Sequence, residues 1–274
     1  MSRGAAEKHP KGSKSPRTRA TGSTDRGHHP SSSTACPQIG FYEWFSSGEY
    51  ERVERILADL KTLGIAHLRT AVSWADWCAP GGEQWYAWLL PRLAEQVEVL
   101  PYFVSTPPSL GMAPKTSAPP RDPKWYADFI DQMITLFGDC FEWVELWSGP
   151  NNLREWDVAL DPEWWSFSRM VGGAAYWVEH RGKKTVLGST GPVDPHWVRL
   201  MCERKVMQYI DAVGMHGLPG PFESGWEGWG PSVARVREVL DRYRFQCRNL
   251  DHRNRLLHLA AYRAPATIGV RPGH

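Results

Sequence analysis

The chain has 274 residues, of which 42% are hydrophobic and 23% are charged, ordinary values for a soluble globular protein. It contains no run of 18 apolar residues, so no membrane-spanning helix is expected, and residues 1–30 lack the apolar segment of a secretory signal. Its five cysteines are scattered and odd in number, which argues against a complete disulfide framework and favours a reducing, cytoplasmic setting.

The net charge of +2 is unevenly distributed along the chain. Residues 1–36 carry a net +5 and residues 242–274 a net +6, so the part between them is strongly acidic. An acidic body with two basic ends does not provide the single basic face of a nucleic-acid binder, and no nucleic-acid partner is expected. Residues 1–36 are polar and lack apolar periodicity, which predicts a disordered basic tail.

From residue 38 onward the apolar pattern predicts six strands, each followed by a helix. Strands are expected at 39–45, 66–74, 97–105, 141–147, 185–189 and 210–216. Helices are expected at 49–63, 83–96, 123–137, 163–181, 195–209 and 231–243. Asp122-Pro123 and Asp161-Pro162 each mark a helix start, because Asp caps a helix N-terminus and Pro suits the first helical position.

Repeated strand–helix units predict a parallel sheet, either doubly wound or closed into a barrel. No Gly-x-Gly-x-x-Gly loop follows the first strand, and long aromatic-rich loops follow several strands, so the α/β fold expected is a (β/α)8 TIM barrel with its site at the carboxyl ends of the strands. All fifteen tryptophans lie between Trp44 and Trp229, which places the folded domain within 37–243. After Tyr243 only 31 residues remain, and only the apolar stretch 256–262 could form a short strand or helix. We therefore predict an incomplete, truncated barrel of about six βα units, with an irregular basic tail over 244–274.

The most specific motif is Glu-Leu-Trp-Ser-Gly-Pro-Asn-Asn at 145–152, at the end of the fourth expected strand. It resembles the Trp-Asn-Glu-Pro-Asn signature of retaining glycoside hydrolases of clan A, the β-xylosidase-like type. The resemblance implies a sugar-cleaving barrel in which the Glu of that signature is the general acid/base. In this chain Ser148 stands in place of the Asn and Gly149 in place of that Glu.

The same resemblance assigns two further positions and leaves one empty. Arg69, on the second expected strand, matches an arginine that supports the nucleophile in such barrels. His216, at the end of the sixth, matches a position that lines the sugar subsite. The nucleophilic Glu belongs at the end of a seventh strand, which is expected to be missing. With Gly149 at the acid/base position, no intact catalytic residue is predicted.

Other carboxylates could replace the lost acid. Glu145 lies four residues earlier, about 13 Å deeper along the strand, and is better interpreted as a buried partner of Arg69, because buried charges are usually paired. Glu43, Glu223 and Glu227 are further candidates, although a strand-end or solvent-facing position explains them more simply.

The sequence predicts that an oligosaccharide or glycoside contacts polar and aromatic side chains at strand ends. Turn formation explains the two asparagines among them about as well. The predicted substrate-binding residues are Arg69, Trp74, Trp147, Asn151, Asn152, His216 and Trp226. No cofactor is implied, and no recognisable spacing of ligands predicts a metal site.

Three functional interpretations follow. The first is a glycoside hydrolase relative that is impaired or inactive in catalysis, because loss of a general acid alone typically costs about 10²–10⁴ in rate. The second is a carbohydrate-binding pseudoenzyme. The third is a non-functional, truncated gene product whose open sheet edges favour aggregation.

Overall fold

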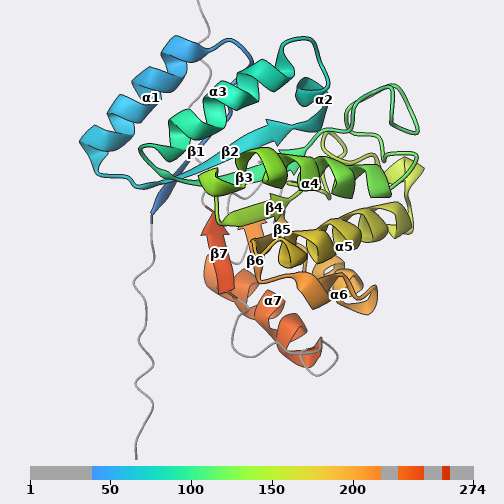
Figure 1. Cartoon of the computed structure of the whole chain (residues 1–274). Coiled ribbons are helices and arrows are strands. Elements are labelled where there is room, and N and C mark those ends of the chain that lie inside the picture. The colour runs from blue at the N-terminus through green and yellow to red at the C-terminus, as the bar shows by residue number, and fades with distance from the viewer. Residues whose placement is uncertain (1–38, 217–227, 244–254, 260–274) are drawn as a thin grey trace, which may run out of the picture. The chain divides into compact units, whose positions relative to one another are not determined.

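The computed structural model describes residues 39–216, 228–243 and 255–259, which contain a seven-stranded sheet (Figure 1). The strands are β1 (Gly40–Glu43), β2 (His67–Ser73), β3 (Glu98–Val104), β4 (Trp143–Leu146), β5 (Lys184–Thr190), β6 (Ala212–His216) and β7 (Arg255–Leu259). They are hydrogen-bonded in the order β1-β2-β3-β4-β5-β6-β7, and every neighbouring pair is parallel.

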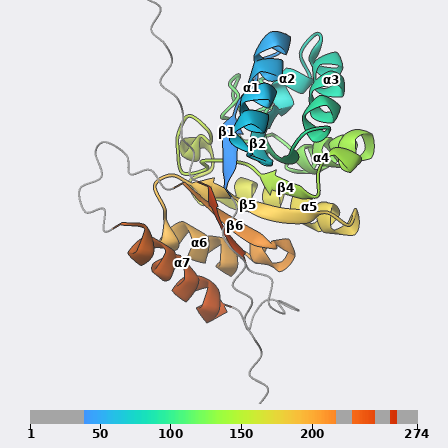
Figure 2. The same ribbon diagram turned by 90° about the vertical axis from the view of Figure 1, so that its left-hand side faces the viewer.

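Helices connect successive strands and follow one another around the outside of the sheet, as two views at right angles show (Figures 1 and 2). The α-helices are α1 (Tyr50–Leu63), the short α2 (Trp74–Trp77), α3 (Gly82–Ala94), α4 (Lys124–Phe137), α5 (Trp165–His180), α6 (Pro195–Glu203) and α7 (Trp229–Tyr243). Three 3₁₀ turns are η1 (Gly138–Cys140), η2 (Val158–Leu160) and η3 (Val206–Tyr209). None of the helices in the described ranges is long and apolar enough to cross a bilayer.

The strand order distinguishes between the two topologies expected for a parallel sheet. In a doubly wound sheet the order reverses at a switch point, whereas here each strand lies beside the next one in the chain. This sequential order is that of a TIM barrel. Among the described strands β1 is not paired with β7, so the fold is a partial barrel of six βα units, as the sequence predicts.

The seventh strand corrects part of the sequence prediction. β7 pairs with β6 in parallel, from Ala212 beside Arg255 to His216 beside Leu259, so the expectation that strand seven is missing, and that 244–274 is irregular throughout, is wrong for these five residues. The sequence pattern allowed either a short strand or a helix in the apolar stretch near 256, and the structure has a strand there. The chain has no Asp or Glu after Asp251, so β7 adds pairing to the sheet but brings no nucleophilic carboxylate.

The buried faces follow from the sequence pattern. Val53, Leu57 and Leu60 form the buried stripe of α1, which ends at Gly64 in the left-handed conformation (φ 67°) that glycine adopts without strain. β2 is buried at six of its seven positions, as expected for a parallel strand covered on both faces. One inner-face position of this strand is the charged Arg69.

The two predicted helix-start signals both act, at shifted positions. The Asp122 carboxylate accepts a hydrogen bond from the backbone nitrogen of Lys124 at 2.9 Å. Asp161 accepts from the backbone nitrogens of Ser166 (3.0 Å) and Phe167 (2.9 Å). Each carboxylate therefore satisfies amide groups in the first turn of its helix that have no partner within the helix.

Candidate functional site

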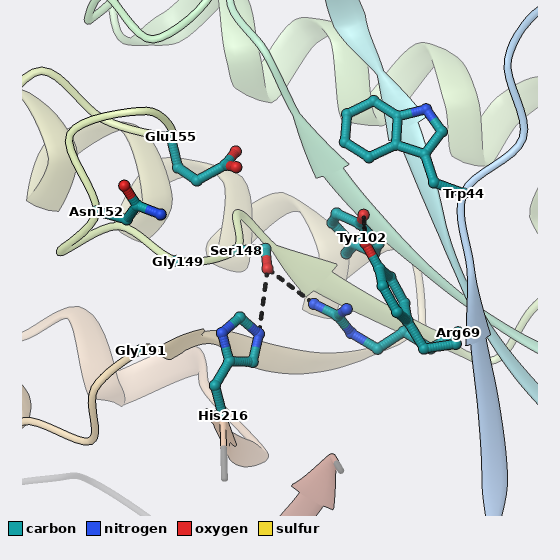
Figure 3. A pocket seen from close by; sticks show the side chains of 10 residues that line it. Trp44, Arg69, Tyr102, Ser148, Gly149, Asn152, Glu155, Gly191 and His216 are labelled. Atoms are coloured by element: carbon teal, nitrogen blue, oxygen red, sulfur yellow. Dashed lines mark hydrogen bonds between the residues drawn. The ribbon is translucent and has the colours of Figure 1, made fainter. Parts of the chain in front are cut away.

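A pocket of about 140 Å³ lies at the carboxyl ends of the strands (Figure 3). This is the edge of a TIM-type sheet at which active sites are built. Five of its residues were singled out from the sequence: Arg69, Ser148, Gly149, Asn152 and His216. The complete lining is Tyr42, Trp44, Arg69, Tyr102, Ser148, Gly149, Asn152, Glu155, Gly191 and His216.

A buried ion pair forms the base of the pocket and confirms the structural interpretation of Glu145. Arg69 Nε donates to Glu145 Oε2 at 2.7 Å, and Arg69 Nη2 donates to Oε1 at 2.8 Å. Glu145 is fully buried and Arg69 nearly so. Burial alone would lower the pKa of Arg69, but the Glu145 carboxylate outweighs it and raises that pKa above its ordinary value. Arg69 is therefore held charged, and both Glu145 oxygens are occupied by its guanidinium.

Ser148, which replaces the amide of the resembled signature, joins this pair to His216. Its Oγ accepts from Arg69 Nη2 at 2.9 Å and lies 3.5 Å from His216 Nε2. Burial, followed by the charge of Arg69, lowers the pKa of His216 to about 4, so the imidazole is neutral near pH 7. On its other side the ring lies against Gly191, where an added Cβ would be 2.9 Å from His216 Nδ1. Glycine at 191 thus leaves room for the ring.

Aromatic side chains from β1, from the loop that follows β1, and from β3 form one wall of the pocket. The Arg69 guanidinium lies 4.0 Å from the ring centre of Tyr102 and 5.1 Å from that of Tyr42. The two tyrosine hydroxyls are 2.9 Å apart. Trp44 meets Tyr102 edge to face at 6.3 Å and keeps part of its surface exposed. It is therefore the indole placed to contact a ligand.

Glu155 is a second ligand-facing pocket residue, after Trp44, that sequence reasoning missed. It lies in the loop after β4, where backbone bonds from the nitrogens of Glu155 and Trp156 to the Asn152 carbonyl form a tight turn, both at 2.9 Å. This turn brings the Glu155 side chain back beside Gly149 (Figure 3). Burial raises the pKa of the Glu155 carboxyl above its ordinary value, and Arg69 opposes the shift. No periodic signal marks the residue, because it belongs to a loop.

The predicted contact of Trp74 with a ligand is not supported by its position. Trp74 begins α2 rather than ending β2 and does not line the pocket. Its ring stacks on Phe129 at 5.6 Å with an interplanar angle of 13°. Trp74 is therefore part of the packing between α2 and α4.

Trp147 is likewise directed away from the pocket. β4 ends at Leu146, and Trp147 adopts a left-handed φ of 68°, so strand alternation no longer sets the direction of its side chain. The fully buried indole packs against Tyr126 and Trp156. Its carbonyl oxygen would lie 2.1 Å from a Cβ at position 188, which explains the glycine there.

The two asparagines differ in role. Asn151 joins the β4 and β5 loops, because its Oδ1 accepts from the Gly191 nitrogen and its Nδ2 donates to the Pro192 carbonyl, both at 2.9 Å. Asn152 lines the pocket, while its Oδ1 accepts from the Arg154 nitrogen at 3.0 Å. The Asn152 side chain therefore stabilises a local turn and stays available to a ligand, whereas the Asn151 side chain holds two loops together.

The remaining predicted residues are outside the pocket or outside the described ranges. Trp226, Glu223 and Glu227 belong to the latter group. Glu43 ends β1, where its carboxylate binds Arg52 at 2.6 Å. Within the described ranges no group of three or more His, Cys, Asp or Glu side chains is placed to hold a metal ion.

Comparison with known proteins gives distant structural similarity. No family model and no curated protein matches the chain. A glycoside hydrolase family 30 xylanase C from Talaromyces cellulolyticus matches with 13% identity and a TM-score of 0.48, over 66% of this chain and 53% of that one. A family 39 glycoside hydrolase from Bacteroides cellulosilyticus matches with 9% identity and a TM-score of 0.47, over 67% and 39%.

The likeness is not restricted to glycoside hydrolases. A dipeptide epimerase from Enterococcus faecalis matches with 9% identity and a TM-score of 0.43, over 75% of this chain and 45% of that one. The chain spans about half or less of the length of these three proteins. The assignment of a partial TIM barrel rests on the strand order and pairing described above.

Introducing a glutamate at position 149 is expected to destabilise the protein and not to create hydrolysis. Gly149 has a φ of 59°, and a Cβ there would lie 3.2 Å from the Cγ of Glu155. Gly149→Glu should lose about 1–2 kcal/mol from the left-handed backbone and a further 1 kcal/mol or so from crowding. The midpoint of denaturant unfolding measures both losses.

A matched substitution separates the two contributions. Gly182 has a similar φ of 71° with nothing within 4 Å of an added Cβ. Gly182→Glu should show the backbone loss alone, and Gly149→Glu combined with Glu155→Ala should recover the difference. Equal losses at 149 and 182 would show that Glu155 does not occupy the space beside Gly149.

Proposed function

We propose that this chain binds one sugar unit of a glycoside in the pocket and that it is a glycoside hydrolase relative, of the β-xylosidase-like type, without retaining hydrolysis. The observation that carries the proposal is the composition of the pocket. The partly exposed indole of Trp44 faces a set of polar groups in which, among the described residues, Glu155 supplies the one carboxyl group. Aromatic surface with a few placed polar groups is the usual design of a small-ligand site.

The size of the pocket supports a small polar ligand. Its volume of about 140 Å³ is below the roughly 300–1,000 Å³ of sites for drug-sized molecules, and corresponds to about five water molecules. One monosaccharide ring with its hydroxyl groups suits this space. Ser148, Asn152 and His216 offer oxygen and nitrogen atoms for hydrogen bonds to those hydroxyls.

The carboxyl groups argue against retaining catalysis. That mechanism needs two of them about 5–5.5 Å apart, one to donate a proton and one to attack. Among the described residues Glu155 is the one carboxyl group that lines the pocket, and Glu145 is bound by Arg69 through both oxygens. The strand that would carry the nucleophile, β7, has no acidic residue.

Calorimetric titration with xylose, glucose and xylobiose tests binding, and release of the aryl group from nitrophenyl xylosides and glucosides tests hydrolysis. We expect saturable heats and no release above the uncatalysed rate. Trp44→Ala should weaken binding about tenfold, equivalent to about 1.4 kcal/mol of lost aromatic contact. Absence of heat with every sugar would overturn the binding role, and saturable enzyme-dependent release would overturn the loss of hydrolysis.

A further inference from the structure

Glu155 occupies the space that a side chain at position 149 would need. A Cβ built on Gly149 would be 3.2 Å from Glu155 Cγ and 3.8 Å from Glu155 Cβ. The side chain of Glu155, six residues later in the chain, thus lies where a side chain at position 149 would stand. Figure 3 shows this carboxylate directed toward the interior of the pocket.

The other polar groups in and beneath the pocket either have a partner or carry no charge. Arg69 is neutralised by Glu145 through two hydrogen bonds, and the neutral imidazole of His216 adds no charge near pH 7. Tyr42 and Tyr102 bond to each other. Within the described ranges the Glu155 carboxylate has neither an ion pair nor a hydrogen bond, so in its ionised form it gives the pocket a net charge of −1.

The wall opposite Glu155 also favours a positive group. Trp44 lies across the pocket from Glu155 (Figure 3), and the face of an indole attracts cations. A partly desolvated carboxylate gains most from a partner that is both charged and a hydrogen-bond donor. An ammonium group meets both requirements, whereas a second carboxylate would be repelled.

We propose that Glu155 is the specificity-determining residue of the pocket and selects an amino sugar, with its ammonium group on the Glu155 carboxylate and its ring beside Trp44. This inference rests on the proposed sugar-binding function and adds the chemical class of the ligand. The expected order of affinity is amino sugar, then neutral sugar, then uronic acid.

Calorimetry at neutral pH with the methyl glycosides of glucosamine, glucose and glucuronate tests this order on a glucose ring with an ammonium group at C2, with no charged group, or with a carboxylate at C6. Wild-type protein should bind the amine about tenfold more tightly than the neutral sugar, the difference expected for a charge-assisted hydrogen bond. Glu155→Gln keeps the size of the side chain and should reduce that ratio to about one, while glucuronate binds more tightly than before. Glu51→Gln, which changes an exposed glutamate on α1, should leave all three affinities unchanged.

The outcomes distinguish the proposed selectivity of Glu155 from the proposed binding of sugar in the pocket. If the three sugars bind with equal affinity, or if Glu155→Gln keeps the preference for the amine, the role of Glu155 is wrong while sugar binding stands. If none of them binds, both proposals fail. Unchanged thermal unfolding of Glu155→Gln ensures that a lost preference reflects the carboxylate rather than the fold.

Discussion

Replacing Glu145 by alanine should destabilise the protein by about 3–5 kcal/mol, because it leaves the guanidinium of Arg69 buried without its counter-ion. Arg69 is bound by both Glu145 oxygens, at 2.7 and 2.8 Å, and is 5% exposed. For a domain of this size that loss corresponds to a fall of about 6–20 °C in the melting temperature. Thermal unfolding followed by circular dichroism measures it.

An exposed pair of the same geometry provides the control. Arg181 binds both oxygens of Asp131 at 2.7 and 2.9 Å, but both side chains are more than one-third exposed. Asp131→Ala should therefore cost about 1 kcal/mol or less. Replacing both members of the buried pair by apolar residues, Arg69→Met with Glu145→Leu, should recover most of the stability lost in Glu145→Ala. Equal losses for Glu145→Ala and Asp131→Ala would show that burial of the pair does not matter.

This pair also shows how far the sequence alone could predict the structure. The six strand–helix units follow from apolar periodicity, and the sequential sheet follows from the absence of a phosphate-binding loop. The pairing of Arg69 with Glu145 could be predicted because two charged residues on inner strand positions must find each other. The pairing of β7 could not, because one short apolar stretch is compatible with a strand or a helix.

The mouth of the pocket was less predictable, because local backbone conformation determines it. Regular strand alternation would put Trp147 on the same face as Glu145, but the left-handed φ of Trp147 breaks the alternation one residue after β4 ends. Bulky residues rarely adopt this conformation, so it could not be predicted from the sequence. The same loop then turns at Asn152 and brings in Glu155, which no spacing rule connects with Gly149.

Trp147→Ala should therefore remove about 3–5 kcal/mol of stability, the usual cost of truncating a buried aromatic residue. The indole is fully buried between Tyr126, at 5.6 Å, and Trp156, at 5.2 Å. Its Nε1 also donates to the Glu155 carbonyl at 3.2 Å, so the cavity would open directly beneath the Glu155 loop. The midpoint of denaturant unfolding at an unchanged slope gives the loss.

Comparison with Trp44→Ala assigns each tryptophan its role. Trp44 is partly exposed at the pocket wall, so its removal should cost clearly less stability than removal of Trp147 while weakening sugar binding. Trp147→Phe should retain most of the packing but lose the hydrogen bond to the Glu155 carbonyl. Reversed results, with stable Trp147→Ala protein that no longer binds sugar, would mean that the indole of Trp147 contacts the ligand as the sequence alone had suggested. The direction of one side chain thus decides whether the motif at 145–152 holds the ligand itself or holds the loop that presents Glu155.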